Sequence, residues 1–429
     1  MLKHWIWLAQ RKGIGHVGCK KLLEALHSAE EIYDMTAEQY ATLSLKGMKS
    51  QWITSLADKD LKDAETVIHD CNRYGIQVIT YNDSLYPQRL KDIYDPPCVL
   101  YCKGTMPEID QEAVIGVVGT RRCTNYGLLL TKQMSSMISL SGGIVVSGGA
   151  RGIDTMALYG ALSAYMPVVC VLAGGLDRYY PSENRKLFED ITRQGCLLSE
   201  LPPGTPPVPK YFVARNRLIS GLSLGVLVIE APEKSGALTT AELALSQNRD
   251  VFTLQRKDSG HYNRGNQALI DSGCQVVRDG WELLARYAPQ FPDRLRDGRG
   301  REAMMLQCQK QYGKNFYFRS PQVVIGSPDS EKLEEILPLP KELSESMVRT
   351  ISKPKTQKKQ KEPDVFEDIP EDLPESERKI LTVLGKNAME LDEIIMKSGM
   401  EAMTVTTALT MLQIKKRIIK SFGNSYQRI

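Results

Sequence analysis

The sequence is poor in the residues that build metal sites, disulfide frameworks and membrane spans. Its five histidines stand far apart, without the spacing of metal ligands. Its nine cysteines are an odd number without paired spacing, which argues against a disulfide framework. The apolar stretch within the first residues is too short for a signal peptide or a membrane span. We therefore expect a cytoplasmic protein that holds no metal and does not associate with membranes.

Signatures of two nucleotide-binding classes are absent as well. No G-x-x-x-x-G-K-[ST] loop for ATP occurs in the chain. The α/β part of the sequence has no G-x-G-x-x-G turn followed by an acidic residue at the position that binds a ribose, so we do not expect a dinucleotide site. These absences count against an enzyme that uses ATP or a dinucleotide.

The charge balance of the chain is only mildly basic. Its 429 residues carry a formal net charge of +4, and the pI is near 8.4. A partner of opposite charge must therefore be held by a local patch rather than by the whole surface. The length exceeds one ordinary core, so we expect two to four domains.

Four segments differ in their residue patterns. Residues 1–75 carry apolar residues at three- and four-residue spacing and predict a small helical domain. Residues 76–287 begin with a connector and continue as short β-branched runs that alternate with helical segments. Residues 288–375 combine an insertion without a clear period and a linker with lysine, acidic and proline runs. Residues 376–429 predict three helices and a hairpin, the pattern of a winged helix.

The second segment predicts a Rossmann-like, doubly wound α/β domain with a parallel sheet. Strands that are buried on both faces of such a sheet have continuous apolar runs bounded by turn residues. Five runs fit this description: AVIGVVG, GIVVSGG, PVVCVLAGG, LGVLVIEA and DVFTLQ. Helical segments such as YGLLLTKQMSSMISLSG separate them, as a doubly wound fold requires.

Loops rich in glycine and arginine follow several of these strands. Because the carboxyl ends of the strands form the binding crevice of an open α/β sheet, we expect the loops to converge on one edge. Glycine lets backbone N–H groups approach an anion, and cations form charge-assisted bonds to phosphates. Six cations exceed the need of one nucleotide and suit a strand of phosphates: Arg121, Arg151, Arg185, Lys186, Arg215 and Arg217.

Aromatic residues lie among these cations in the sequence. A base stacked on an aromatic ring contributes roughly 1–3 kcal/mol without reading the sequence of the nucleic acid. The candidates are Tyr179, Tyr180, Phe188, Tyr211 and Phe212. A core position fits Phe188 and Phe212 equally well, and a salt-bridge role stays open for any single arginine.

Several long blocks resemble the signature blocks of the bacterial DNA-processing protein family, DprA, also called Smf. These blocks are GTRRCTNYG, SGGARGIDTMAL, LAGGLDRYYPSENRKLF, LLSELPPGTPP and ARNRLISGLSLGVLVIEAPEKSGALTTAELAL. The preceding YPQRLKDIYDPPCVLYCKG is similar to the family's lead-in to the same domain. Together they cover about residues 75–280.

The resemblance implies a protein that binds and protects single-stranded DNA and helps to load the RecA recombinase, as in natural transformation. It also implies a homodimer without an established catalytic activity or a required cofactor. The family's groove maps onto the loops at 119–121, 148–151 and 184–186. With the other basic and aromatic residues, the expected DNA-binding set is Gly119, Thr120, Arg121, Arg122, Gly148, Gly149, Arg151, Tyr180, Asn184, Arg185, Lys186, Arg215, Asn216 and Arg217.

The flanking segments contain two further motifs. Lys12–Lys21 resembles a helix–hairpin–helix whose glycine turn can bind a phosphate, and Leu45–Lys49 is a weaker second copy; a simple turn between helices is the alternative. In the C-terminal module the recognition helix, residues 401–416, opens with an acid and has its cations at its end, so we expect protein docking or an accessory role. The Lys353–Lys361 run is most simply a solvated linker.

Two other functions stay open. Residues 236–242 partly resemble the P-G-G-x-G-T-x-x-E motif of Rossmann-type nucleotide phosphoribohydrolase-like enzymes, with Glu242 as the catalytic acid. The missing double glycine and the excess of cations count against that enzyme. The other function is a recombination scaffold that mainly binds protein, with DNA binding secondary.

Overall fold

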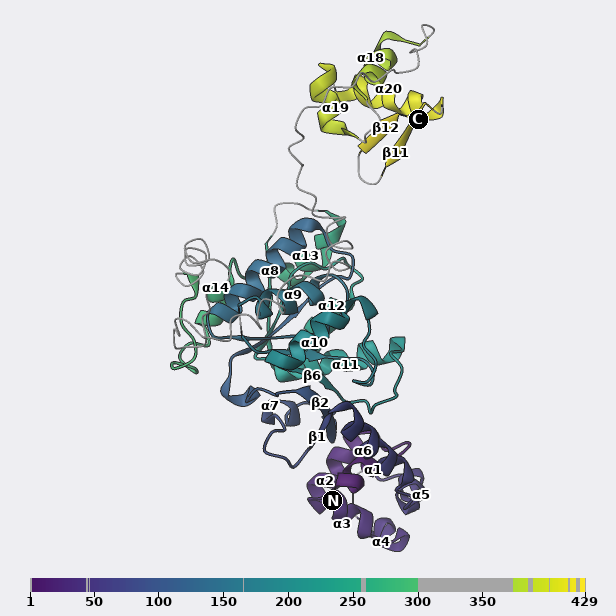
Figure 1. Cartoon of the computed structure of the whole chain (residues 1–429), viewed down its shortest axis with the longest axis vertical. Coiled ribbons are helices and arrows are strands. Elements are labelled where there is room, and N and C mark those ends of the chain that lie inside the picture. Colours follow the sequence, from purple (N-terminus) through teal and green to yellow (C-terminus); the bar gives the residue numbers. More distant parts are fainter. Residues whose placement is uncertain are drawn as a thin grey trace. The chain divides into compact units, whose positions relative to one another are not determined.

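The computed structural model describes residues 2–43, 45, 47–164, 166–255, 260–299, 373–384, 389–400, 402–415, 417–421 and 425–428. The chain forms two compact units, Met1–Lys353 and Pro354–Ile429. The first unit holds a group of helices and a large sheet, and the second holds a small three-helix module (Figure 1). The Lys353–Lys361 run and most of the expected insertion lie outside the described residues.

Six helices form the start of the first unit, as the apolar spacing predicts. They are α1 (Leu2–Ala9), α2 (Gly15–Leu26), α3 (Ala29–Asp34), α4 (Ala37–Thr42), α5 (Ser50–Ala57) and α6 (Lys62–Tyr74). Each helix turns apolar side chains inward, and Trp7, Leu22 and Leu56 from three of the helices are fully buried between them. Polar side chains cap the starts of two short helices. Ser28 accepts a hydrogen bond from the Glu31 amide at the start of α3, and Thr36 caps α4.

A nine-stranded sheet forms the centre of the first unit. Its strands are β1 (Gln77–Thr80), β2 (Val99–Gly104), β3 (Val114–Val118), β4 (Ile144–Ser147), β5 (Val168–Val171), β6 (Cys196–Ser199), β7 (Gly225–Val228), β8 (Asp250–Thr253) and β9 (Gln275–Val276). Their order is β1-β2-β6-β5-β4-β3-β7-β8-β9, and the strands from β6 to β9 are parallel. The chain winds from β3 to β6 in one direction and then returns to the other side of β3, which is the doubly wound topology that the sequence predicts.

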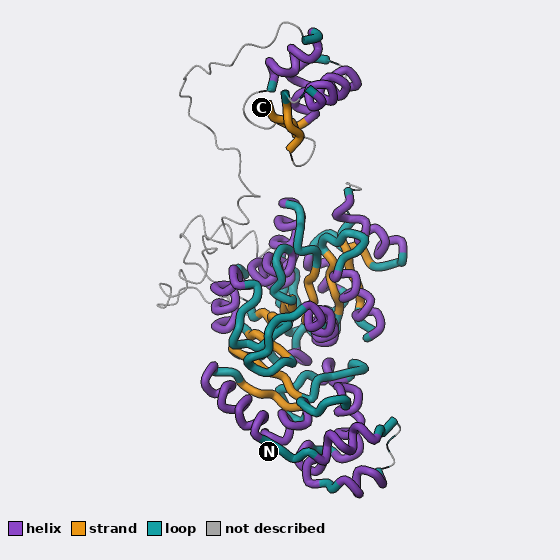
Figure 2. Tube along the Cα trace, turned by 90° about the vertical axis from the view of Figure 1, so that its right-hand side faces the viewer, coloured by secondary structure: helices purple, strands orange, loops and turns teal. Residues whose placement is uncertain are grey.

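Helices cover both faces of the sheet (Figures 1 and 2). On one face lie α8 (Asn125–Leu140), α9 (Ile153–Leu162), α10 (Arg185–Gln194) and α14 (Gly280–Ala285). On the other lie α7 (Gln88–Lys91), α11 (Pro209–Leu222), α12 (Gly236–Ser246) and α13 (Arg264–Asp271). Successive residues of one strand belong to opposite cores, with Ile115 and Val117 in one and Val114 and Val118 in the other. This double burial explains the continuous apolar runs.

The sheet is larger than the sequence predicts. The two strands of the expected connector join it, because β2 pairs antiparallel with β6 and β1 pairs antiparallel with β2. The parallel sheet therefore has an antiparallel extension at one side. The sequence analysis also misses β6, whose residues Cys196–Ser199 include no β-branched side chain, and β9, which has only two residues.

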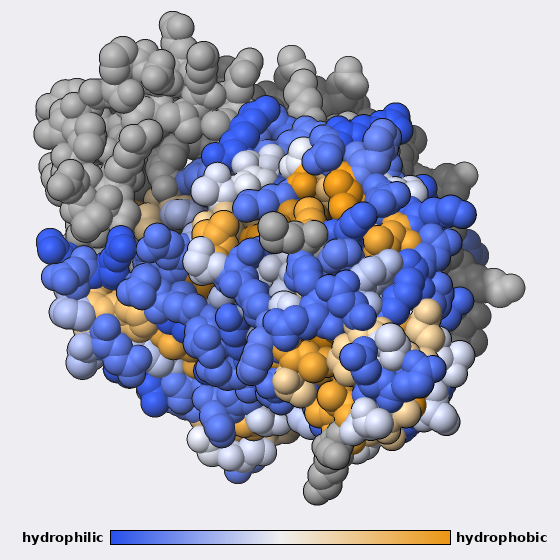
Figure 3. All heavy atoms as spheres, turned by 90° about the horizontal axis from the view of Figure 1, so that it is seen from below, coloured by the Kyte–Doolittle hydropathy of each residue, from blue (hydrophilic) through white to orange (hydrophobic). Residues whose placement is uncertain are grey.

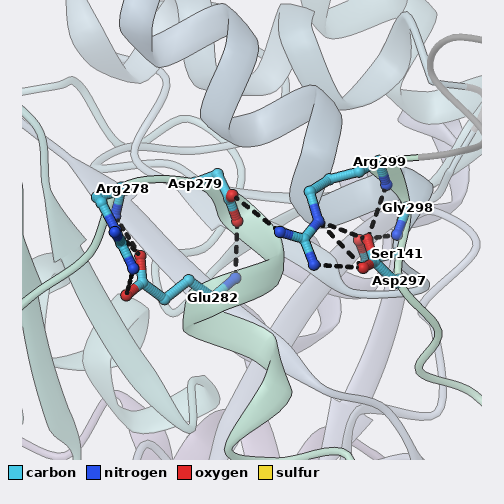
Figure 4. A network of polar contacts seen from close by, with 7 residues as sticks. All are labelled: Ser141, Arg278, Asp279, Glu282, Asp297, Gly298 and Arg299. Atoms are coloured by element: carbon cyan, nitrogen blue, oxygen red, sulfur yellow. Dashed lines mark hydrogen bonds and ion pairs between the residues drawn. The ribbon is translucent and has the colours of Figure 1, made fainter.

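The chain stays packed against the sheet domain beyond residue 287. Leu295 is buried, and the Gly298 amide donates a hydrogen bond of 3.1 Å to Oγ of Ser141 at the end of α8. Arg299 contacts the carboxylates of Asp279 and Asp297 in the same region (Figure 4). Residues 288–299 therefore belong to the folded domain rather than to a linker.

The second unit has the three helices and the hairpin expected of a winged helix. Its elements are α18 (Glu375–Val383), β10 (Met389–Glu390), α19 (Leu391–Ser398), α20 (Ala402–Ile414), β11 (Ile418–Ser421) and β12 (Ser425–Arg428). The strands form a small sheet in the order β10-β12-β11. Ile380, Ile394 and Leu412 are fully buried in a core of its own.

The face shown in Figure 3 is mostly hydrophilic, and its apolar atoms form separate patches. Among the described helices, none combines the length and the apolar character needed to cross a membrane.

Candidate nucleic-acid interface

The loops that follow β3, β4 and β5 meet at the carboxyl edge of the parallel sheet, as expected from the topology. The Thr120 carbonyl, in the loop after β3, accepts a hydrogen bond of 3.3 Å from the amide of Ile153 at the start of α9. The Asn184 side chain, in the loop after β5, donates one of 3.0 Å to the carbonyl of Gly149 in the loop after β4. We call the meeting point of these three loops, residues 119–124, 148–152 and 172–184 with the adjoining start of α10, the loop edge.

The loop after β3 presents two arginines to solvent. Its Gly119 lies against Ile153, so that an added Cβ would approach a side-chain carbon to 2.6 Å. Thr120 is nearly buried, and its amide donates a hydrogen bond of 2.7 Å to the carbonyl of Glu230. Arg121 and Arg122 follow and are exposed. Buried neighbours therefore fix the loop, and its cations face outward.

The loop after β4 turns sharply at two glycines. Gly149 and Gly152 have φ values of 64° and 79°, which L side chains rarely adopt, so the sequence requires glycine there. Between them, the exposed Arg151 forms an ion pair with Glu183. Burial alone would raise the pKa of the Glu183 carboxyl, but the hydrogen bonds from Arg151 and from the backbone, together with the charge of Arg151, lower that pKa on balance. A phosphate that binds Arg151 must therefore displace a carboxylate.

Aromatic rings lie directly beside the cations of the loop edge. Tyr180 is 41% exposed, and its ring packs edge-on against Phe212 with the centroids 5.6 Å apart. The Arg121 guanidinium lies 5.0 Å from the centre of the Phe212 ring. Tyr179 lies 5.8 Å from the guanidinium of Arg185. Bases and phosphates of one strand can thus be bound side by side. Phe188, the other ring with two open roles, is fully buried in the core.

The cations that reach solvent at the loop edge, among which Lys186 is half-buried, differ in whether a carboxylate neutralises them. Arg185 contacts Glu189 at 3.9 Å on the solvent side of α10. Within the described part of the chain, Arg121, Arg122 and Lys186 form no ion pair with a carboxylate. These three positive charges are therefore available to an anion without breaking an internal pair.

Two of the expected cations, Arg215 and Arg217, are buried on α11. Nη1 of Arg215 donates a hydrogen bond of 2.5 Å to the carbonyl of Val171 at the end of β5. Asp154 lies nearby; burial raises the pKa of its carboxyl, and the charge of Arg215 opposes that rise. Arg215 therefore supports the loops after β4 and β5 from beneath rather than facing solvent.

Arg217 belongs to a buried ionic network. It contacts Asp95 at 3.0 Å and Glu200 at 2.5 Å, and His16 lies 3.1 Å from the same Glu200 carboxylate. Burial would raise the pKa of Glu200, but His16 and Arg217 keep it below its usual value. This network joins α11, the loop after β6 and the start of α2. The side chain of Arg217 is 7% exposed.

The two expected asparagines have structural contacts in this arrangement. Asn184 is buried, and its amide group donates to Gly149 and, at 2.8 Å, to Oγ1 of Thr155. Asn216 is half-buried and lies 3.5 Å from the carbonyl of Gly236. Asn184 thus holds the loops together, and no feature of the local sequence distinguishes this role from DNA contact.

The helix–hairpin–helix turn lies between α1 and α2. Gly13 and Gly15 are exposed and have φ values of 82° and 65°. The indole N–H of Trp52 donates to the Gly13 carbonyl at 2.9 Å, and Lys20 donates to two carbonyls at and just after the end of α7, so part of this motif serves internal packing. Gly47, in the expected second copy, has a φ of 92°. Phosphate binding by this turn stays a prediction.

The ends of the expected recognition helix, Glu401 and Lys416, lie outside the described residues. On α20 between them, Thr404, Thr407 and Met411 are exposed and uncharged. Protein docking by this module stays a prediction that agrees with an uncharged face.

Glu242, the acid of the enzyme alternative, and Ser223, which the sequence analysis does not consider, occupy ordinary structural positions. Glu242 is exposed on α12. Residues 221–225 match the letters of a G-x-S-x-G nucleophile elbow, but Ser223 is fully buried after a helix and bonds the Ile219 carbonyl at 2.7 Å. An elbow serine instead follows a strand and is exposed. Within the described ranges, no three His, Cys, Asp or Glu side chains lie close enough to hold a metal.

Comparison with known proteins gives consistent matches over both units. Residues 77–288 match the DNA recombination-mediator protein A family, and residues 366–424 match the DprA winged helix domain. Protein Smf of Synechocystis is 32% identical over 429 residues, which cover 99% of this chain and 98% of that protein. DNA processing protein DprA of Bacillus subtilis is 36% identical over 58% of this chain and 84% of its own. The X-ray structure of DprA from Streptococcus pneumoniae superposes with a TM-score of 0.59 at 29% identity, covering 66% of this chain and 98% of that one.

Proposed function

The chain belongs to the DprA/Smf family of DNA recombination-mediator proteins, and from this premise we propose that it binds single-stranded DNA along the loop edge. The observation that carries the proposal is the contact group of Tyr180, Phe212 and Arg121, where an exposed ring, a second ring and a cation lie side by side. Rings can stack on bases only where the bases are unpaired, so this group favours a single strand over a duplex.

The residues of the loop edge take different parts in this proposal. Arg121, Arg122 and Lys186 bind phosphates directly because they have no internal carboxylate partner in the described structure. Arg151 and Arg185 exchange their glutamate partners for phosphates. The glycine amides approach the backbone of the strand. Asn184, Arg215, Asn216 and Arg217 act from beneath by holding the loops.

The family resemblance supports a biological role beyond binding. We propose that the protein protects single-stranded DNA and helps to load the RecA recombinase onto it, as in natural transformation. It acts in the cytoplasm as a homodimer, without a cofactor and without catalysing a reaction.

Fluorescence anisotropy with labelled oligo(dT) tests the proposal at several salt concentrations. Arg121→Ala/Lys186→Ala should weaken binding and make the slope of log affinity against log salt shallower by roughly 1.4, about 0.7 for each lost phosphate contact. A matched control is Lys62→Ala/Arg73→Ala, which removes the same two residue types from the exposed side of α6.

Equal loss in both double variants, or equal affinity for a duplex competitor, would move the DNA site away from the loop edge. A pull-down with RecA separates the scaffold alternative. Retained RecA binding by Arg121→Ala/Lys186→Ala, with DNA binding lost, would show two separate surfaces.

A further inference from the structure

The start of α8 is the position where a Rossmann domain ordinarily holds a nucleotide. In this fold the turn after the first strand leads into a helix whose N-terminal amides bind the pyrophosphate. Here the equivalent turn runs from β3 to α8, a helix of 16 residues. It lies where the strand order reverses, between β3 and β7.

A carboxylate of the protein itself occupies this position. Glu230 follows β7, and its Oε1 accepts a hydrogen bond of 2.9 Å from the amide of Thr124, the residue that caps α8. Its Oε2 accepts one of 2.7 Å from the Thr124 hydroxyl, which in turn accepts from the Gly127 amide at 2.9 Å. One negative charge thus satisfies the start of the helix.

The fit leaves no room for a second anion. Glu230 is fully buried, and the Cα of Gly127 packs so close that an added Cβ would lie 2.1 Å from Oε2. The backbone of Glu230 also contributes, since its carbonyl accepts the Thr120 amide at 2.7 Å. The loop of residues 119–124, which carries Arg121 and Arg122, is therefore held at both of its ends by one residue of the neighbouring strand.

We infer that Glu230 is a specificity-determining and positioning residue. Its carboxylate takes the place of a nucleotide pyrophosphate, keeps free nucleotides out of the Rossmann crevice, and fixes the 119–124 loop so that its arginines face a polynucleotide. The positioning part of this inference rests on the proposed single-strand function, whereas the exclusion part does not.

The physical reason for the exclusion is that phosphate and carboxylate compete for the same donors. A phosphate at the start of α8 would have to displace Glu230 and leave its charge buried without partners, which is costly in a low-dielectric interior. Phosphates of a DNA strand avoid this cost because the exposed cations of the loop edge bind them farther out.

The test measures two ligands on the full chain: ADP by isothermal titration calorimetry, and oligo(dT) by anisotropy at constant ionic strength. Glu230→Ala should bind ADP at least about tenfold more tightly than the unchanged protein, because it frees the amide and hydroxyl of Thr124 at the start of α8. It should bind oligo(dT) several-fold more weakly, because the loop loses its support. Glu233→Ala, which removes an exposed carboxylate from the same loop, is the matched control and should change neither affinity.

A second variant is needed if Glu230→Ala does not fold, which the absence of a cooperative unfolding transition would show. Glu230→Asp keeps the charge but withdraws it by one methylene, so ADP should stay excluded while oligo(dT) binding weakens. A folded Glu230→Ala that gains no ADP affinity overturns the exclusion. Unchanged oligo(dT) affinity in Glu230→Asp overturns the positioning role. Failure of the unchanged protein to bind oligo(dT) would instead reject the proposed function, and the ADP titration would still decide the exclusion.

Discussion

The Nε2 atom of His16 lies 3.1 Å from Oε2 of Glu200, the same oxygen that Arg217 contacts at 2.5 Å. One buried carboxylate therefore links the first glycine turn of the chain to the helix beneath the loop edge. The contact couples the N-terminal helices to the sheet domain through polar groups as well as through apolar packing.

Removing the charge of Glu200 should destabilise the protein at neutral pH. Glu200→Gln leaves the buried Arg217 with Asp95 alone, and breaking a buried ion pair costs about 3 kcal/mol. Because the pKa of Glu200 is lowered in the folded state, its stabilisation is present above the unfolded pKa and is lost as the pH falls through the folded pKa. Urea unfolding should thus show that Glu200→Gln has a lower free energy of unfolding than the unchanged protein at pH 7, and that this difference is smaller in acid. Glu65→Gln, at an exposed pair, should show none at either pH.

The opposite dependence of stability on pH is expected from Asp190 on α10. Burial raises the pKa of its carboxyl to about 6, although Arg193 lies 3.5 Å away. The folded state therefore binds the proton more tightly, so stability falls as the pH rises from about 4 to 6. Asp190→Asn should raise the free energy of unfolding by about 1–3 kcal/mol above pH 6 and leave it unchanged below pH 4. Thermal unfolding across this range measures the effect; a variant less stable than the parent at pH 7 would contradict it.

Loss of a stacking ring should weaken DNA binding without changing its salt dependence. Tyr180→Ala should cost about 1–3 kcal/mol in oligo(dT) affinity, and the slope of log affinity against log salt should stay constant because no cation is removed. Tyr94→Ala is the control, since this ring is 78% exposed and is not part of the loop edge. A shallower slope for Tyr180→Ala would mean that the ring acts by holding Arg151 rather than by stacking.

A single methyl group at Gly148 should disturb the loop edge from beneath. An added Cβ would lie 1.9 Å from Nη1 of Arg215, which the Val171 carbonyl holds in place. Overpacking of this kind costs about 1–3 kcal/mol, and the displaced loop should also bind oligo(dT) more weakly. At Gly236 a Cβ meets nothing within 4 Å, so Gly236→Ala should be neutral in both assays. The melting temperature and the oligo(dT) affinity of Gly148→Ala and Gly236→Ala, measured side by side, test this difference.

The fold was predictable where the pattern of the sequence reports burial directly. Continuous apolar runs located β3, β4, β5, β7 and β8, because a strand buried on both faces has no polar alternation. The topology rule then placed their loops on one edge. The strand pair at residues 77–104 was recognised, but its pairing with β6 was not, since antiparallel addition at a sheet edge depends on a contact nearly one hundred residues away in sequence.

The roles of single charged residues were less predictable. Arg121 and Arg217 have the same chemistry, and both belong to the expected DNA-binding set, yet Arg121 is exposed in a loop and Arg217 is buried on α11 between Asp95 and Glu200. Whether an arginine pairs with a carboxylate depends on tertiary contacts that the local sequence does not reveal. Glu230 was missed for the same reason, although an acid at the end of an apolar run, as in LGVLVIEA, is a usable signal of a buried partner.

The antiparallel extension of the sheet also sets an order of events during synthesis on the ribosome. The hairpin of β1 and β2 leaves the ribosome early, but the edge of β2 is completed only by β6, roughly one hundred residues later. At common translation rates this interval is about 5–20 s. During that time the N-terminal helices can pack, while the backbone groups along β2 stay unpaired and open to chaperones. β6 thus joins the first-made pair of strands to the parallel sheet before β7, β8 and β9 have been made.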